Sequence, residues 1–180
     1  MYIDGDTHYW PVRFIERVDH PGRGHVELKR GAGEMIRYGE KFPGDAATYY
    51  RDGKKIHSFS ETRWNLEIRH DVMKREGFDY QVVIPDNRPL IYEVEPSLGN
   101  AMARAYNDTV AEDIGGSERF IPISWVYLPD VAEAVRELTR SVTELGFKGV
   151  KLMGGHQNCD LDAEVLWPFY EEVCKLDVPI

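Results

Sequence analysis

Cysteine is scarce in this chain, because only Cys159 and Cys174 occur among its 180 residues. Two cysteines do not build the disulfide framework that stabilises small secreted domains. Cys174 falls on the apolar face of an expected helix, which predicts a buried thiol. The scarcity of cysteine therefore favours a protein of the reducing cytoplasm.

Long hydrophobic runs and an excess of positive charge are also missing. No apolar stretch approaches the roughly 20 residues that a membrane span needs, and the chain does not open with a charged and then an apolar region, as a secretory leader would. Lys and Arg number 22 against 31 Asp and Glu, so the net charge is −9, which disfavours binding to a phosphate backbone. We therefore expect no nucleic-acid partner, no membrane and no secretion.

What the chain does contain, from residue 64 onward, is an alternation of apolar strands and amphipathic helices. Helices are expected where apolar residues recur every three or four positions, and strands where short apolar runs stand between turn signals. The expected helices cover 65–76, 97–114, 131–145 and 168–176, and the expected strands cover 2–6, 80–84, 120–126 and 148–153, with a fifth strand starting at 178. Such alternation produces a parallel sheet with right-handed crossovers.

The ends of these helices carry their own signals. Gly77 stands just past the first helix, where a left-handed C-cap is common. Asp130 is a good N-cap for the helix that follows it, and Glu133 stands three positions later, as in a capping box. Pro168 is acceptable only in the first turn of the last helix.

Residues 12–60 interrupt the alternation. Glycine and proline punctuate this stretch, and Asp52-Gly53 is the two-residue signal of a β-hairpin. We expect a small antiparallel, β-rich insertion after the first strand, within one domain that covers residues 1–180.

Two architectures compete for this alternation. One is a complete, open doubly wound sheet, and the other is the first half of an eight-stranded barrel. A whole barrel needs about 250 residues, so 180 residues cannot close one. The expected fold class is therefore α/β, with a partial (β/α)8 TIM barrel of about four βα units and the start of strand 5.

The opening segment Tyr2–Pro11 holds the clearest chemical signal. Asp6 and His8 are two positions apart, so on a strand their side chains point the same way. A carboxylate oxygen and an imidazole nitrogen are both ligands of Zn²⁺. The pair therefore predicts half of a divalent metal site at the carboxyl end of the first strand.

Several further segments form a recognisable pattern when they are taken in their order along the chain. The most telling is Leu145-Gly-Phe-Lys-Gly-Val-Lys-Leu152, and the others are Arg69–Met73, Gly77–Asp79, Ala105–Asp108, Leu161–Asp162, Trp167–Tyr170 and Val178–Ile180. With the Asp6-x-His8 start, they resemble the amidohydrolase superfamily, and within it the branch related to aminocarboxymuconate semialdehyde decarboxylase. The resemblance covers 1–11 and about 62–180, but not the insertion.

The resemblance implies a divalent metal bound by Asp6 and His8, with zinc expected ahead of manganese. In the family, a histidine after the fifth strand and an aspartate after the eighth complete the site. Neither position falls within residues 1–180, so the sequence is expected to hold the N-terminal half and to end inside strand 5. The implied activity is metal-dependent decarboxylation or hydrolysis of a small carboxylate-bearing substrate, aromatic acids among them.

In such barrels the active site lies on the loops that follow the strands. His156 is predicted to contact substrate or to transfer a proton, the alternative being a loop histidine bound to backbone. Arg88 is predicted to pair with a substrate carboxylate, unless it is simply solvated. Trp10 and Trp125 are predicted to line a pocket for a planar substrate, with core packing as the alternative for Trp125. Asn158 is a further predicted substrate contact.

Two other hypotheses remain open from the sequence. A stand-alone open α/β domain without catalytic activity, acting as a binding or oligomerising module, predicts a cooperative melt and no response to metal. A half-barrel that pairs with a second copy to restore eight strands predicts a homo-oligomer.

Overall fold

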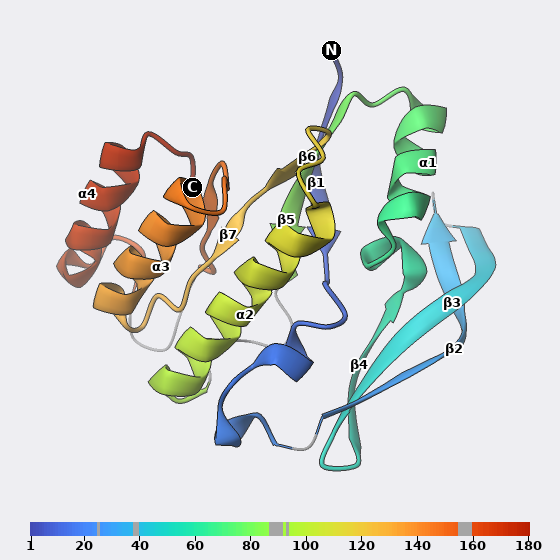
Figure 1. Ribbon diagram of the computed structural model, residues 1–180, viewed down its shortest axis with the longest axis horizontal. Helices are drawn as coiled ribbons and strands as arrows, with labels where there is room; N and C mark the ends of the chain where they lie inside the picture. Colours follow the sequence, from blue (N-terminus) through green and yellow to red (C-terminus); the bar gives the residue numbers. More distant parts are fainter. Residues whose placement is uncertain (25, 38–39, 87–91, 93, 155–159) are drawn as a thin grey trace.

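The chain is a mixed α/β structure in the computed structural model, which describes residues 1–180 except 25, 38–39, 87–91, 93 and 155–159. Its helices are α1 (Leu66–Glu76), α2 (Pro96–Ile114), α3 (Val131–Thr143) and α4 (Trp167–Leu176). Its strands are β1 (Ile3–Tyr9), β2 (Val26–Arg37), β3 (Glu40–Arg51), β4 (Lys54–Ser60), β5 (Tyr80–Pro85), β6 (Phe120–Pro122), β7 (Ser124–Trp125) and β8 (Val150–Lys151). Figure 1 shows α2, α3 and α4 on one side of β1, with α1 and β2–β4 on the other. Within the described ranges, no helix combines the length and apolar composition needed to cross a bilayer.

The parallel strands bring their carboxyl ends to one edge. β1, β5 and β6 form a parallel sheet in that order, and β7 pairs in parallel with β8. Tyr9 at the end of β1 lies opposite Pro85 at the end of β5. The amide of Ile123, between β6 and β7, donates to the carbonyl of Val83 at 3.0 Å. The β6–β7 segment therefore lies between β5 and β8, and the four carboxyl ends follow one another along the edge.

The strands differ in length from the expectation. β1 extends to Tyr9, so His8 lies inside the strand rather than after it. The expected strand 120–126 is divided into β6 and β7, since Pro122 has no amide hydrogen to donate to a ladder. The expected strand 148–153 is reduced to β8, although the amide of Lys148 still donates to the Pro122 carbonyl at 2.9 Å.

The helix ends follow the sequence signals in part. Gly77 caps α1 in the left-handed conformation, at φ 78°. The Asp130 carboxylate accepts the amide of Glu133 at 3.2 Å, but the Glu133 carboxylate pairs with Arg136, so only half of the capping box forms. α2 begins at Pro96 because the Glu95 carboxylate caps it.

The insertion contains the expected hairpin. β2, β3 and β4 form an antiparallel sheet in that order. Asp52 and Gly53 both have positive φ, at 51° and 76°, in the turn between β3 and β4, which is the backbone that a tight hairpin requires. Between β1 and β2 the chain forms short 3₁₀ turns at Ile15–Arg17 and Pro21–Arg23.

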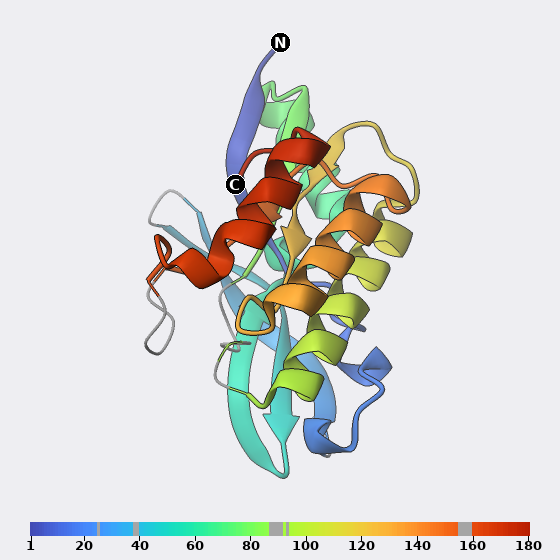
Figure 2. The same cartoon turned by 90° about the vertical axis from the view of Figure 1, so that its left-hand side faces the viewer.

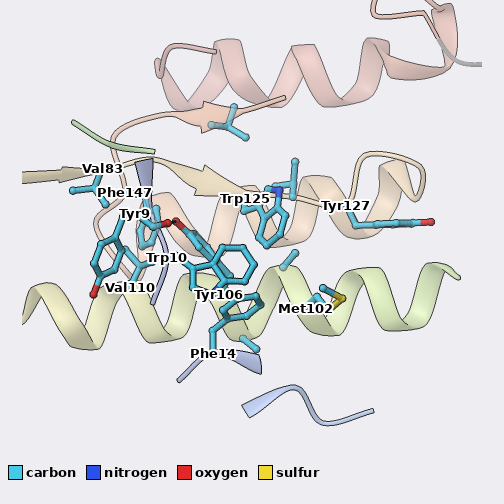
Figure 3. Close-up of a cluster of buried hydrophobic side chains, with 14 of the residues drawn as sticks. Tyr9, Trp10, Phe14, Val83, Met102, Tyr106, Val110, Trp125, Tyr127 and Phe147 are labelled. Carbon is cyan, nitrogen blue, oxygen red and sulfur yellow. Dashed lines mark hydrogen bonds between the residues drawn. The ribbon is translucent and has the colours of Figure 1, made fainter. Parts of the chain in front are cut away.

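An aromatic cluster fills the core between the parallel strands and α2 (Figure 3). Trp10 follows β1, Trp125 ends β7, and Tyr106 projects from α2, each 1% exposed or less. The rings of Tyr106 and Trp125 meet edge to face with centroids 5.0 Å apart, and Phe14 lies edge-on to Trp10 at 4.8 Å. Such contacts fix the strand that carries Asp6 and His8 against the longest helix of the described chain.

The expectation that Cys174 is buried is wrong, because its side chain is exposed on α4. The buried residues of α4 are Phe169 and Val173. Cys174 is one position past Val173, and one position turns the side chain about 100° around a helix. The thiol therefore lies beside the apolar stripe and not within it.

Gly99 permits the close contact between α2 and Tyr127. A Cβ at position 99 would lie 2.1 Å from Cδ2 of the Tyr127 ring. That ring is buried, and its hydroxyl donates to the Val94 carbonyl at 2.8 Å. We therefore expect Gly99→Ala to lower the free energy of unfolding by about 1–3 kcal/mol through overpacking, measured by urea denaturation. Gly31→Ala is the matched control, since nothing lies within 4 Å of its added Cβ; an unchanged midpoint in Gly99→Ala would contradict the packing argument.

Candidate metal and substrate site

His8 is oriented by the backbone of the neighbouring strand. Its Nδ1 lies 3.1 Å from the carbonyl oxygen of Pro85. A carbonyl oxygen can only accept, so Nδ1 carries the hydrogen and donates it. The other ring nitrogen, Nε2, therefore presents a lone pair. This is the arrangement by which an outer hydrogen bond fixes the tautomer of a metal-binding histidine.

The lone pair of His8 faces Asp6. Nε2 of His8 lies 3.8 Å from Oδ1 of Asp6, and the side chains are 29% and 84% exposed, respectively. A cation at about 2.0–2.2 Å from both atoms requires that they lie no more than about 4.4 Å apart. The pair meets this condition, so the residues fit a divalent cation. Within the described ranges no group of three or more His, Cys, Asp or Glu residues could hold a metal ion.

Two charged side chains that the sequence reasoning missed lie at the same edge. Lys151, the last residue of β8, donates from Nζ to the Pro85 carbonyl at 3.0 Å. Burial lowers the pKa of Lys151, while Asp86 and Asp6 oppose that shift. Asp86, directly after β5, is 5% exposed and lies 3.1 Å from Nη1 of Arg63. Position at the carboxyl end of a parallel strand was the available signal for both residues.

Buried polar groups hold the end of β1 in place. Arg69 on α1 donates from Nη2 to the carbonyl of His8, and from Nη1 to Gln81 Oε1 at 3.2 Å. Burial lowers the pKa of Arg69 to about 10, which leaves it charged at neutral pH. The hydroxyl of Tyr106 donates to the Tyr9 carbonyl at 3.0 Å. The two backbone carbonyls that follow the His8 Cα are thus tied to α1 and α2.

The remaining predicted site residues lie apart from this cluster or outside the described residues. Trp10 and Trp125 belong to the aromatic core, where each is 1% exposed. Arg88, His156 and Asn158 lie outside the described residues. The structure therefore brings together Asp6 and His8, and adds Lys151 and Asp86 to them.

These features define an α/β protein that gathers potential metal ligands at the carboxyl edge of its parallel strands. Comparison with known proteins gives the family. The amidohydrolase family profile matches residues 3–180, and the chain belongs to the amidohydrolase family. The resemblance noted from the sequence is thus confirmed.

Curated relatives confirm the decarboxylase branch. The chain is 25% identical over 130 residues to 2-amino-3-carboxymuconate-6-semialdehyde decarboxylase of Dictyostelium discoideum, a match that covers 72% of this chain and 36% of the relative. It is 36% identical over 147 residues to gamma-resorcylate decarboxylase of Rhizobium radiobacter, covering 76% of this chain and 42% of the relative. The match thus spans well under half of the length of either relative.

A solved structure corrects the expected metal. The 5-carboxyvanillate decarboxylase of Novosphingobium aromaticivorans was solved with bound manganese and 3-methoxy-4-hydroxy-5-nitrobenzoic acid. It matches 65% of this chain and 34% of its own, at 28% identity and a TM-score of 0.60. The expectation of zinc ahead of manganese is therefore wrong. Carboxylate and imidazole ligands accept either metal, so Asp6 and His8 alone do not distinguish the two.

Proposed function

We propose that this chain forms part of a manganese-dependent decarboxylase that acts on a small aromatic carboxylate. The observation that carries the proposal is the pairing of Asp6 with the lone pair of His8 at 3.8 Å, in a chain whose relatives are decarboxylases of carboxylic acids. Hydrolysis, the other reaction open from the sequence, is less favoured because neither of these relatives is named as a hydrolase.

We infer that the fold is a partial (β/α)8 barrel of four βα units, with residues 12–60 inserted after its first strand. The units are β1–α1, β5–α2, β6/β7–α3 and β8–α4. The parallel strand order supports this inference. The hydrogen bond from the Val150 amide to the Pro179 carbonyl, at 3.0 Å, supports residues 178–180 as the start of strand 5 beside β8.

In the proposed reaction the ring carbon that bears the carboxylate gains a proton. The bond to the carboxylate carbon then breaks, its electron pair stays on the ring, and CO₂ leaves. Asp6 and His8 would hold the divalent metal, which would supply a Lewis acid for the carboxylate group. The Pro85 carbonyl accepts the hydrogen of His8 Nδ1 and so fixes the orientation of the His8 ring.

The predicted loop residues keep their roles within this proposal. His156 is the proposed proton-transfer group, and Arg88 and Asn158 are proposed substrate contacts. Trp10 and Trp125 support the site through the core, since their side chains are buried; a direct contact with a planar substrate remains part of the proposal.

The test is an assay of the complete gene product loaded with Mn²⁺. We expect loss of the ultraviolet absorbance of 2,6-dihydroxybenzoate or 5-carboxyvanillate, with release of one CO₂ per acid consumed. Treatment with a chelator should remove the activity, and added Mn²⁺ should restore it. Hydrolysis of a lactone or amide panel, with no CO₂ from any aromatic acid, would overturn the proposal in favour of a hydrolase.

A further inference from the structure

Lys151 reaches across the carboxyl edge of the sheet. It ends β8, yet its ammonium nitrogen lies 3.0 Å from the carbonyl of Pro85 at the end of β5. The β6–β7 segment lies between these strands, because Ile123 donates to Val83 and Ser124 donates to Gly149. The side chain therefore passes over the end of the intervening strand and brings its charge to the acceptor that orients His8.

The ammonium group has hydrogen-bonding capacity left over. A lysine carries three N–H donors, and Lys151 spends one on Pro85. A half-buried cation that keeps one carbonyl acceptor has regained only part of the hydration that burial removed, so an incoming anion is favoured there.

The two carboxylates that oppose the lowered pKa of Lys151 each face another side chain. Asp86 lies 3.1 Å from Nη1 of Arg63. Asp6 faces Nε2 of His8, and in the proposed function it shares a divalent metal with that nitrogen. A metal held there would largely neutralise the charge of Asp6, and Lys151 would remain as a positive charge at the same edge of the sheet.

We propose that Lys151 binds the carboxylate of the aromatic acid and so selects acids over the corresponding phenols. This inference rests on the proposed function. A charge-assisted N–H···O⁻ bond is roughly twice as strong as a neutral one. An interaction with the carboxylate in the bound acid strengthens substrate binding and adds little at the transition state, because the charge of that group disappears as CO₂ forms.

The experiment compares two ligands that differ only in the carboxylate. The binding of 2,6-dihydroxybenzoate and of resorcinol to the Mn²⁺-loaded complete gene product is measured by calorimetry for wild type, Lys151→Met and Lys151→Arg. Lys151→Met should weaken binding of the acid by about 10- to 100-fold and leave resorcinol within about 2-fold. Its KM for the acid should rise while its kcat does not fall, because the lost contact stabilises the bound acid more than the transition state. Lys151→Arg, which keeps the charge, should recover part of the affinity for the acid.

The controls separate this role from a purely structural one. Lys148→Met removes an exposed lysine three residues earlier and should change neither ligand's affinity. If Lys151→Met weakens the binding of both ligands equally, or leaves binding of the acid unchanged, the proposal that Lys151 binds the carboxylate is refuted. If wild type binds both ligands but releases no CO₂, the proposed function fails while the comparison of acid with phenol still decides the role of Lys151. If wild type binds neither ligand, both proposals fall.

Discussion

Asp6→Asn is expected to lower the affinity for Mn²⁺ by at least about 100-fold and to abolish decarboxylation, without unfolding the protein. The amide keeps the shape of the carboxylate but removes the negative charge that faces Nε2 of His8 at 3.8 Å. Loss of an outer-shell partner alone typically costs 10- to 100-fold in metal affinity or activity, so loss of a direct charged ligand should cost more. Because the Asp6 side chain is 84% exposed, the substitution leaves the core packing untouched.

The measurement is calorimetric titration of the metal-free protein with Mn²⁺, with circular dichroism to confirm the fold. Asp71→Asn is the matched control, since it makes the same chemical change at an exposed position of α1. Its metal affinity should equal that of wild type. If Asp6→Asn binds Mn²⁺ as tightly as wild type does, Asp6 is not a ligand and the assignment of the site is wrong.

Asn107→Leu is expected to cause the largest loss of stability, about 3–5 kcal/mol in the free energy of unfolding. Asn107 on α2 is fully buried. Its side-chain amide hydrogen-bonds to both the backbone N–H and the backbone carbonyl of Trp125 in β7. Oδ1 accepts the Trp125 amide at 2.9 Å, and Nδ2 donates to the Trp125 carbonyl at 2.9 Å and to Glu137 Oε1 at 2.7 Å. Leucine has a similar volume but leaves the Trp125 amide and carbonyl without that partner, and each buried, unsatisfied polar group costs about 1–3 kcal/mol.

Urea denaturation with a shared slope provides the measurement. Asn100→Leu is the matched control on the same helix, because Asn100 makes a single, half-buried bond from Nδ2 to Asp130 at 3.0 Å. It should cost about 1 kcal/mol or less. Equal losses in the two variants would contradict the argument that the hydrogen bonds from Asn107 to the Trp125 backbone make a large contribution to the free energy of unfolding.

The local parts of this fold were predictable because their causes are local. The recurrence of apolar residues every three or four positions along the helices, the glycine after α1 and the Asp52-Gly53 turn depend on neighbouring residues only. The proximity of Asp6 and His8 was predictable too, since alternation along a strand places residues two apart on one face.

The parts that escaped prediction depend on contacts between distant segments. Arg69 looks like an ordinary helix-surface cation, yet α1 turns it inward to the His8 carbonyl, 61 positions away. Lys151 lies in a segment that predicted a strand and carried the family resemblance, but its contact with Pro85 joins residues 66 positions apart. Such contacts follow from strand register and helix rotation, which the order of residues does not reveal by itself.

The Pro85 carbonyl belongs to the main chain, and this has an evolutionary consequence. Any amino acid at that position would present the same oxygen to His8 and Lys151, provided the strand keeps its course. The element that aims the imidazole is therefore immune to point substitution at its own position. Comparing sequences column by column would overlook it, whereas a one-residue insertion in β5 would move it away from both donors at once.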